Sequence, residues 1–443
     1  MLRITNGTTT ITLSGDAPNA ILGCTYWPAT GGGKEITETI PVILEGSEAT
    51  VKATVQAITN LLREAEQADE ATNYIVYLEF QATAGSSVYR SEIKTGWANW
   101  DKEPVRHKLD SASNAVEVAV ILTRANYWEG PETEVALSTQ AQSASVGGRT
   151  IYNNDNATSQ NNYAQAAANQ ILGDLPTPLK VRVTNAAGTG VAWRRFHLCN
   201  NVFSDPAAAD VWLLGSEAVG GASQSWGAGG ITHTSQLYIF NLTTTLLGQF
   251  RGRTARVLAA FTSATAGIYF KAGMYTSFGG VYTPLRVRRS EVYNSDSSGI
   301  SAFRLLDLGQ FPIPPGGYNA GAAGGAALII TARYPGAGST NLDFINLMAS
   351  DGGDDFNNFA HCEQLGYTTG NGDSIELDGI DGGAFSLFSG SRQPFIKLHT
   401  DYLYGWPGKV QRFHVLYDEG AAFTAGRQMT LRVFHRPRVR TVG

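Results

Sequence analysis

The side chains that could do chemistry are scattered along this chain instead of forming a motif. Its 7 histidines lie in separate segments, without the paired spacing of a zinc site. Asp351–Asp355 and Asp378–Gly383 place carboxylates around glycines, which suits either a calcium site or a plain turn. No serine elbow with acid and histidine partners stands out, and no glycine-rich loop precedes a Lys-Ser or Lys-Thr pair. The sequence therefore predicts no enzyme, no metal site and no cofactor.

Large aromatic side chains are the next candidates, because their rings can make contacts outside the chain. Trp212 and Trp226 could each stack on a sugar ring or close the core of a sandwich. Four further rings lie near expected strand ends, where they seal either a core or a contact between subunits: Trp97, Trp100, Tyr127 and Trp128.

Arginine is concentrated in two short segments, 286–289 and 436–440. Alternating arginines on a strand usually mark a solvated or subunit-contacting face, and a phosphate site is the alternative. Arg288, Arg436 and Arg438 are therefore added to the candidate subunit contacts.

Composition limits the classes of function. The formal net charge is −5, so no general cationic field draws the chain to nucleic acid or to a membrane surface. Charged residues make up 16% of the 443 residues and glycine numbers 50, which suits short strands joined by tight turns. The 3 cysteines lie far apart and are expected to be reduced thiols. No signal peptide and no membrane span is recognisable, which predicts folding in a cytoplasm.

The elements that must position these residues are mostly strands, with one clear helix over residues 49–69. Apolar residues recur there at three- and four-residue steps from Val51 to Ala65, and Ser47 can cap the first turn. Residues 73–80 and 116–122 alternate apolar and other side chains, as half-buried strands do. We expect residues 1–135 to form one β domain with this helix on its flank.

The rest of the chain divides into three parts by composition. Residues 136–190 are rich in Ser, Asn and Gln and predict a connector arm, with a short helix near 163–172. Residues 191–365 hold many short strand patterns between glycine-rich turns, which predicts a jelly-roll β-sandwich. Residues 366–443 carry too few strands for a core of their own and are expected to complete the first domain.

Two parts of the sequence resemble known families. The helix at 49–69, the strands around it, residues 114–131 and the segment Trp406–Leu416 resemble the tail-tube and distal-tail proteins of tailed bacteriophages. The middle part, through residues 305–314 and 342–348, resembles galectin-like and carbohydrate-binding jelly rolls. The fold class expected is mainly β: a tail-tube-like sandwich or barrel with one flanking helix, plus a jelly roll.

This resemblance implies a non-enzymatic virion protein, assembled in the bacterial host, that forms a ring as a distal-tail or baseplate adaptor. Its partners would be copies of itself and other phage tail proteins. The alternatives are a major tail-tube subunit and an adhesion protein that binds a host-surface glycan. A β-sandwich hydrolase is a further alternative, although no catalytic set can be named for it. Sequence-specific nucleic-acid binding and a membrane span are not expected.

Overall fold

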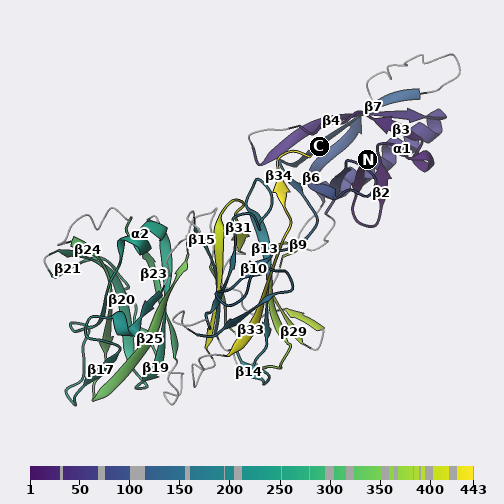
Figure 1. Cartoon of the computed structure of the whole chain (residues 1–443). Coiled ribbons are helices and arrows are strands. Elements are labelled where there is room, and N and C mark those ends of the chain that lie inside the picture. Colours follow the sequence, from purple (N-terminus) through teal and green to yellow (C-terminus); the bar gives the residue numbers. More distant parts are fainter. Residues whose placement is uncertain are drawn as a thin grey trace. The chain divides into compact units, whose positions relative to one another are not determined.

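The computed structural model is mainly β-structure with two α-helices in its described part. It describes residues 1–29, 33–67, 75–99, 115–154, 160–193, 195–203, 212–250, 252–278, 280–294, 304–315, 324–350, 359–363, 368–382, 384–388, 391–394, 403–418 and 427–442. The chain forms two compact units (Figure 1). Unit 1 comprises Met1–Thr133, Gly173–Leu175 and Arg436–Gly443, and unit 2 comprises Glu134–Leu172 and Pro176–His435.

Unit 1 is built on one nine-stranded sheet. Along the main path the strand order is β2-β1-β5-β6-β7-β4-β3, and β8 pairs with both β6 and β34. The strands are β1 (Leu2–Thr5), β2 (Thr10–Thr12), β3 (Ile21–Cys24), β4 (Glu35–Glu45), β5 (Tyr77–Gln81), β6 (Val88–Asn99), β7 (Ala115–Ala125), β8 (Trp128–Glu129) and β34 (Arg438–Val439). A 3-10 turn, η1 (Ala17–Asn19), precedes β3.

The helix expected from the sequence is present as α1 (Glu48–Glu66). Ser47 caps it by accepting a hydrogen bond from the backbone N–H of Thr50 at 3.2 Å. Its apolar stripe is buried against the inner face of the sheet, and the buried residues are Val51, Thr54, Val55, Ile58, Leu61, Leu62 and Ala65. The helix therefore closes the core of unit 1.

Unit 2 begins with a β-sandwich that we call the host sandwich. One sheet has the order β10-β12-β32-β15-β26, from strands β10 (Leu137–Ser138), β12 (Tyr163–Ala166), β32 (Val410–Asp418), β15 (Arg195–Phe203) and β26 (Phe359–Glu363). The other has the order β11-β33-β13-β28-β29-β30, from β11 (Arg149–Tyr152), β33 (Gln428–His435), β13 (Thr177–Asn185), β28 (Ser374–Asp378), β29 (Ala384–Phe388) and β30 (Ser391–Pro394). Shorter strands at its margins are β9 (Thr133–Glu134), β14 (Val191–Ala192), β27 (Thr368–Thr369) and β31 (Tyr404–Gly405). Apolar residues of both sheets share one core.

A second sandwich is inserted between β15 and β26, and we call it the inserted sandwich. Its sheets have the orders β16-β25-β19-β23 and β18-β24-β20-β21, which is the strand order of a jelly roll. The strands are β16 (Trp212–Leu214), β17 (Ser223–Trp226), β18 (Gln236–Asn241), β19 (Thr254–Ala264), β20 (Tyr269–Phe278), β21 (Val281–Val287), β22 (Val292–Tyr293), β23 (Leu305–Pro312), β24 (Gly324–Arg333) and β25 (Gly338–Ala349). Helices η2 (Gly215–Glu217) and α2 (Thr244–Phe250) complete it.

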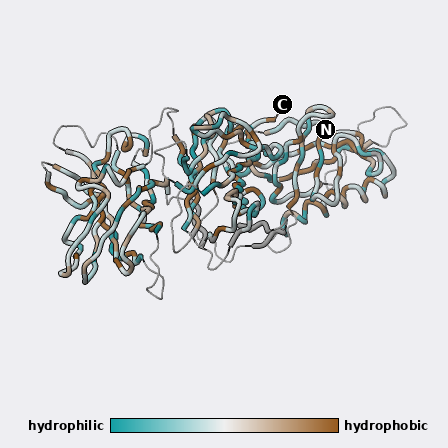
Figure 2. Tube along the Cα trace, turned by 60° about the horizontal axis from the view of Figure 1, so that its bottom comes forward, coloured by the Kyte–Doolittle hydropathy of each residue, from teal (hydrophilic) through white to brown (hydrophobic). Residues whose placement is uncertain are grey.

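Hydrophobic and hydrophilic positions alternate along many strands of both units (Figure 2). In the described residues of β33, for example, every second side chain from Met429 to His435 is buried. This period of two is why the strand pattern was visible in the sequence.

The structure corrects three of the expected boundaries. Residues 136–190 are not a connector arm, because β10, β11, β12 and β13 all lie there and belong to the host sandwich. The short helix expected near 163–172 is absent from the described residues, where 163–166 form β12, paired with β32. Strands of the segment 366–443 complete the host sandwich and not the first domain, and residues 436–443 alone belong to unit 1.

The reason for these corrections is that the partner strands lie far away in sequence. Ser- and Asn-rich strands such as β11 are held by backbone pairing with β33, which no local pattern reveals.

Neither helix in the described ranges is long and apolar enough to cross a bilayer.

Candidate assembly surface

A buried ion pair organises the wall of unit 1 around Trp128. Arg124 donates from Nε to Glu38 Oε2 at 2.9 Å and from NH2 to Oε1 at 2.6 Å, and both side chains are almost fully buried. The guanidinium stacks on the Trp128 ring at 4.5 Å. Such a pair is stable in a core only when its remaining hydrogen-bonding groups are also satisfied.

Hydrogen-bond partners for the Glu38 carboxylate come from the segment that follows β3. Glu38 also accepts from the Tyr26 hydroxyl at 3.0 Å and from the Ala29 backbone N–H at 2.7 Å. Burial raises the pKa of Tyr26, so its hydroxyl remains a donor. The segment 25–29 is therefore fixed to the core at two points.

Trp27 lies between these two fixed points and faces solvent. Tyr26 packs inward against Phe80 and Trp128, with ring centroids 6.3 Å away from each. Because neighbouring side chains of an extended chain point to opposite sides, Trp27 points outward and is 86% exposed. The backbone that carries this exposed indole is already fixed, so little conformational entropy remains to be lost when Trp27 binds a partner.

Trp27 belongs to the outer face of the sheet, on which the exposed Glu117 of β7 lies opposite Ile43. Thr25 continues the pairing of β3 with β4 by donating to the Pro41 carbonyl at 3.3 Å. On β4, the outward residues between Glu35 and Glu45 are Thr37, Thr39, Pro41 and Ile43. The register places Ile121 of β7 beside Thr39 and beside Trp97 of β6.

Four apolar side chains on this face are exposed, and we call them the outer patch. They are Leu22 (55% exposed), Trp27 (86%), Ile43 (39%) and Trp97 (49%). The opposite face of the same strands packs on α1, so the outer patch is not part of the core of unit 1. Exposed apolar groups gathered on one face are typical of contact sites.

The other subunit-contact candidates of unit 1 are placed differently. Trp128 is fully buried, which corrects its assignment as a contact residue. Arg438 donates to Glu129 at 2.8 Å and stacks on Tyr127 at 4.2 Å, so these candidates bind each other. Arg436 lies 4.0 Å from Glu132, and Trp100 lies outside the described residues.

The two candidate sugar-stacking tryptophans serve the inserted sandwich. Trp212 is 6% exposed and packs edge-on against Phe344 with centroids 5.3 Å apart, so it offers no face to a sugar. Trp226 is half-buried, packs on Tyr334, and donates from its indole to the Gly336 carbonyl at 3.0 Å. Both rings close the sandwich, which was the alternative stated for them.

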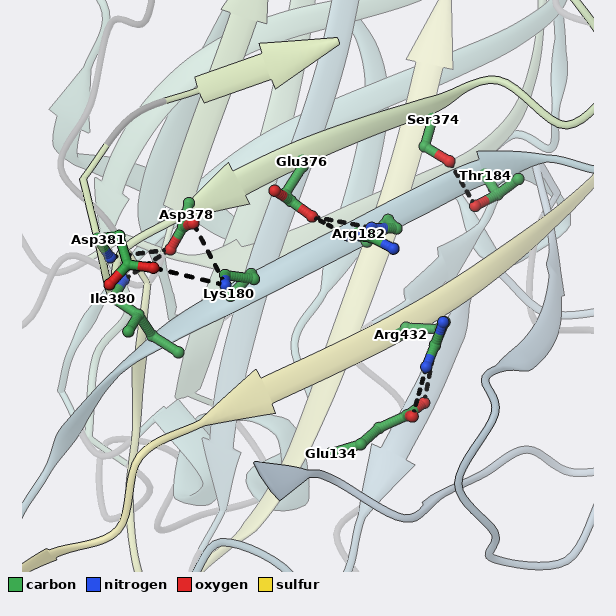
Figure 3. A network of polar contacts seen from close by, with 10 residues as sticks. All are labelled: Glu134, Lys180, Arg182, Thr184, Ser374, Glu376, Asp378, Ile380, Asp381 and Arg432. Atoms are coloured by element: carbon green, nitrogen blue, oxygen red, sulfur yellow. Dashed lines mark hydrogen bonds and ion pairs between the residues drawn. The ribbon is translucent and has the colours of Figure 1, made fainter. Parts of the chain in front are cut away.

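A ladder of ion pairs covers part of one host-sandwich sheet (Figure 3). Arg182 pairs with Glu376 at 2.5 Å, and Lys180 with Asp378 at 3.4 Å, because the strand register sets each base opposite an acid. Asp378 also accepts from two backbone N–H groups of the turn that follows, each at 3.0 Å. These contacts fit the plain-turn alternative for this turn.

Arg432 and Glu134 extend the ladder on a neighbouring strand, with a 2.6 Å contact (Figure 3). Each base of the ladder has an acid partner, and such cross-strand pairs help to fix the register of the strands. No group of three or more metal-ligating side chains occurs among the residues that the structure describes. The other Asp-Gly turn, 351–355, lies outside them.

Arg288 lies on the inserted sandwich, immediately after β21. Its NH1 donates to the Asp307 carbonyl at 3.0 Å, and its Nε donates to Ser290 Oγ at 2.9 Å. Neither acceptor is charged. This arginine and its neighbours line a cavity that is treated separately below.

Comparison with known proteins adds little to this geometry. No family model and no curated protein matches the chain. One similar solved structure is described as the phage P2 baseplate in its activated conformation with Ca, with 6% identity, 100% of this chain and 99% of that chain covered, and a TM-score of 0.22. A TM-score this low does not establish a shared fold, so function has to be argued from the chain's own surfaces.

Sequence reasoning missed Leu22, Trp27 and Ile43. The signal for Trp27 was a Tyr-Trp-Pro triplet outside any apolar repeat, but its exposure depends on the distant Arg124 and Glu38. The sequence pointed to Trp97 because it lies near the end of an alternating strand.

Proposed function

We propose that this chain is a structural component of a phage tail and that it assembles with further copies of itself into a ring. The observation that carries the proposal is the pair of exposed tryptophans, Trp27 and Trp97, on one face of unit 1. Interface cores are enriched in aromatic residues, and this face exposes two of them.

A second copy of the chain is the proposed occupant of the outer patch. The main path of the sheet ends in two different strands, β2 and β3, each paired on one side only within the described residues. Edge strands can pair with a neighbouring chain, and two unlike edges suit a head-to-tail contact. A head-to-tail contact that closes on itself gives a ring.

Within the tail, we assign the chain to the distal end as a baseplate adaptor, with the major tail-tube subunit as the alternative. The adaptor is favoured because unit 2 adds two sandwiches to unit 1, whose sequence resembles tail-tube proteins, and a tube subunit does not need them. The proposed role is non-enzymatic, the partners are other tail proteins, and the location is the virion after assembly in the bacterial cytoplasm.

The test is light scattering on the purified full chain, with negative-stain imaging of the same peak. We expect rings, and we expect Trp27→Ser and Trp97→Ser each to weaken ring formation about thirty-fold or more, the effect of losing a 2 kcal/mol contact. Phe278→Ser is the matched control, because Phe278 is an equally exposed aromatic residue of the inserted sandwich (76%).

Three outcomes would count against this reading. A monomer at high concentration would contradict ring assembly, and rings that stack into long tubes would favour the tube subunit. If both tryptophan variants still form rings as well as the unchanged chain does, the outer patch is not part of the contact between subunits.

A further inference from the structure

The inserted sandwich contains a cavity of about 660 Å³ at its open side. It lies between β21, an edge strand of one sheet, and β23, an edge strand of the other, with β19 behind. We call it the arginine cavity, and its main lining residues are Arg256, Arg286, Arg288, Arg289, Gln310 and Phe311. Its volume falls in the usual range for small-molecule sites.

The charges of the arginine cavity do not cancel. Asp307 pairs with Arg256 at 2.8 Å, and its other carboxylate oxygen accepts from the Gly309 backbone N–H at 2.9 Å. Among the described residues, no carboxylate lies within ion-pair distance of Arg286, Arg288 or Arg289. Three of the arginines that line the cavity therefore have no countercharge from the described part of the chain.

The cavity is also held in shape. Arg288 is fixed by the Asp307 carbonyl and by Ser290, as described above. Gly309 has a φ of +105°, and a Cβ there would lie 3.2 Å from the Arg288 side chain. Glycine thus provides the space through which Arg288 reaches the Asp307 carbonyl. Arg286 and Arg289 remain exposed and free to turn toward a ligand.

We propose that the arginine cavity binds phosphate groups carried on a saccharide or polyol chain. A guanidinium presents a planar fork of donors that matches phosphate oxygens, and several such groups together suit a multiply charged ligand. The volume exceeds that of one phosphate, which leaves room for the unit that carries it. This proposal is independent of ring assembly, because it concerns unit 2 alone.

Two other ligand classes fit the lining less well. A neutral sugar or a nucleic-acid base would be expected to stack on an exposed aromatic ring. Phe311 is the aromatic residue of the lining, and it is buried to 1% exposure in the core of the sandwich. The net charge of −5 also works against a long nucleic acid.

The test is isothermal titration calorimetry of the full chain with five probes: glucose 1-phosphate, glycerol 3-phosphate, a poly(glycerol phosphate) chain, neutral glucose and single-stranded DNA. We expect the phosphorylated probes to bind and glucose not to bind, with affinity that falls as salt rises. The order of affinity among the phosphorylated probes shows whether a sugar or a polyol carries the phosphate.

Variants locate the site. Arg286→Gln and Arg289→Gln are each expected to weaken binding at least ten-fold, and both side chains are exposed, so folding should be unaffected. Lys271→Gln is the matched control, since it removes one charge from the same sandwich outside the cavity. If Arg286→Gln and Arg289→Gln bind the phosphorylated probes as tightly as Lys271→Gln does, the proposal is overturned. Equal binding of glucose, or tighter arginine-dependent binding of single-stranded DNA, would also overturn it.

Discussion

Replacing Arg124 by methionine should unfold unit 1 far more easily and leave unit 2 unchanged. The substitution keeps much of the side-chain volume but leaves the Glu38 carboxylate buried without its partner. Breaking a buried pair in this way costs about 3–5 kcal/mol. Loss of the stacking contact with Trp128, 4.5 Å from the guanidinium, acts in the same direction.

Hydrogen exchange measured by mass spectrometry can separate the two units within one sample. At a factor of ten for each 1.4 kcal/mol, amides of β4 and β7 that exchange by global opening should exchange about 140- to 3700-fold faster. Peptides from β13 and β33 belong to unit 2 and serve as the internal control, with no change expected.

A double variant tests the cause of the loss. Arg124→Met combined with Glu38→Leu removes both charges and leaves the Tyr26 hydroxyl and the Ala29 N–H without an acceptor, at about 1–3 kcal/mol for each unsatisfied group. These two losses sum to about 2–6 kcal/mol, which spans the 3–5 kcal/mol expected for Arg124→Met, so the double variant should be about as stable as the single one. An acceleration below ten-fold in β7 for the single variant, or a clearly less stable double variant, would refute the reasoning.

Three further predictions concern stability. Arg182→Met leaves the Glu376 carboxylate buried without its partner and should lower the stability of the host sandwich by about 1–3 kcal/mol, measured by denaturant titration. This is less than for a fully buried pair, because Arg182 is 32% exposed and solvent screens the pair. Burial lowers the pKa of His435 from 6.5 to about 4, so between these pH values the unfolded chain binds a proton that the folded chain does not. The free energy of unfolding should therefore fall by about 1.4 kcal/mol for each pH unit as the pH drops from 6.5 to 4. His435→Phe should remove that part of the pH dependence in melting curves, and an unchanged slope would contradict it. Ser47→Ala removes the cap of α1 and should cost about 1 kcal/mol, seen as faster exchange in the first turn of the helix only.

Local pattern explains why part of the fold could be predicted from sequence. The stripe from Val51 to Ala65 and the cap at Ser47 are local signals, and α1 formed where they lie. The alternation in β7 is equally local, and it predicted a strand of the correct type. The mainly β class follows from such segments.

Long-range pairing explains what could not be predicted. An Ala-rich segment after Tyr163 has helix-forming composition, but its first residues pair with β32, about 250 residues further along the chain. Similarly, the strands β32 and β33 gave no local sign that their partners belong to the host sandwich. For the candidate site, the exposure of Trp27 depends on an ion pair between β4 and β7, which only the folded sheet brings together.

The nesting of one sandwich within another determines the order in which the protein can fold on the ribosome. β11 pairs with β33, so roughly 280 residues separate the two strands, and their synthesis takes about 15 to 55 seconds at usual translation rates. The strands of the inserted sandwich all emerge during that interval, whereas the host sandwich is still incomplete. The host strands made first therefore lack their partners until β32 and β33 are made, and β15 and β26, which flank the inserted sandwich in the sequence, pair with each other in the finished fold. β34, which follows all of these strands in the sequence, pairs with β8, which precedes all of them.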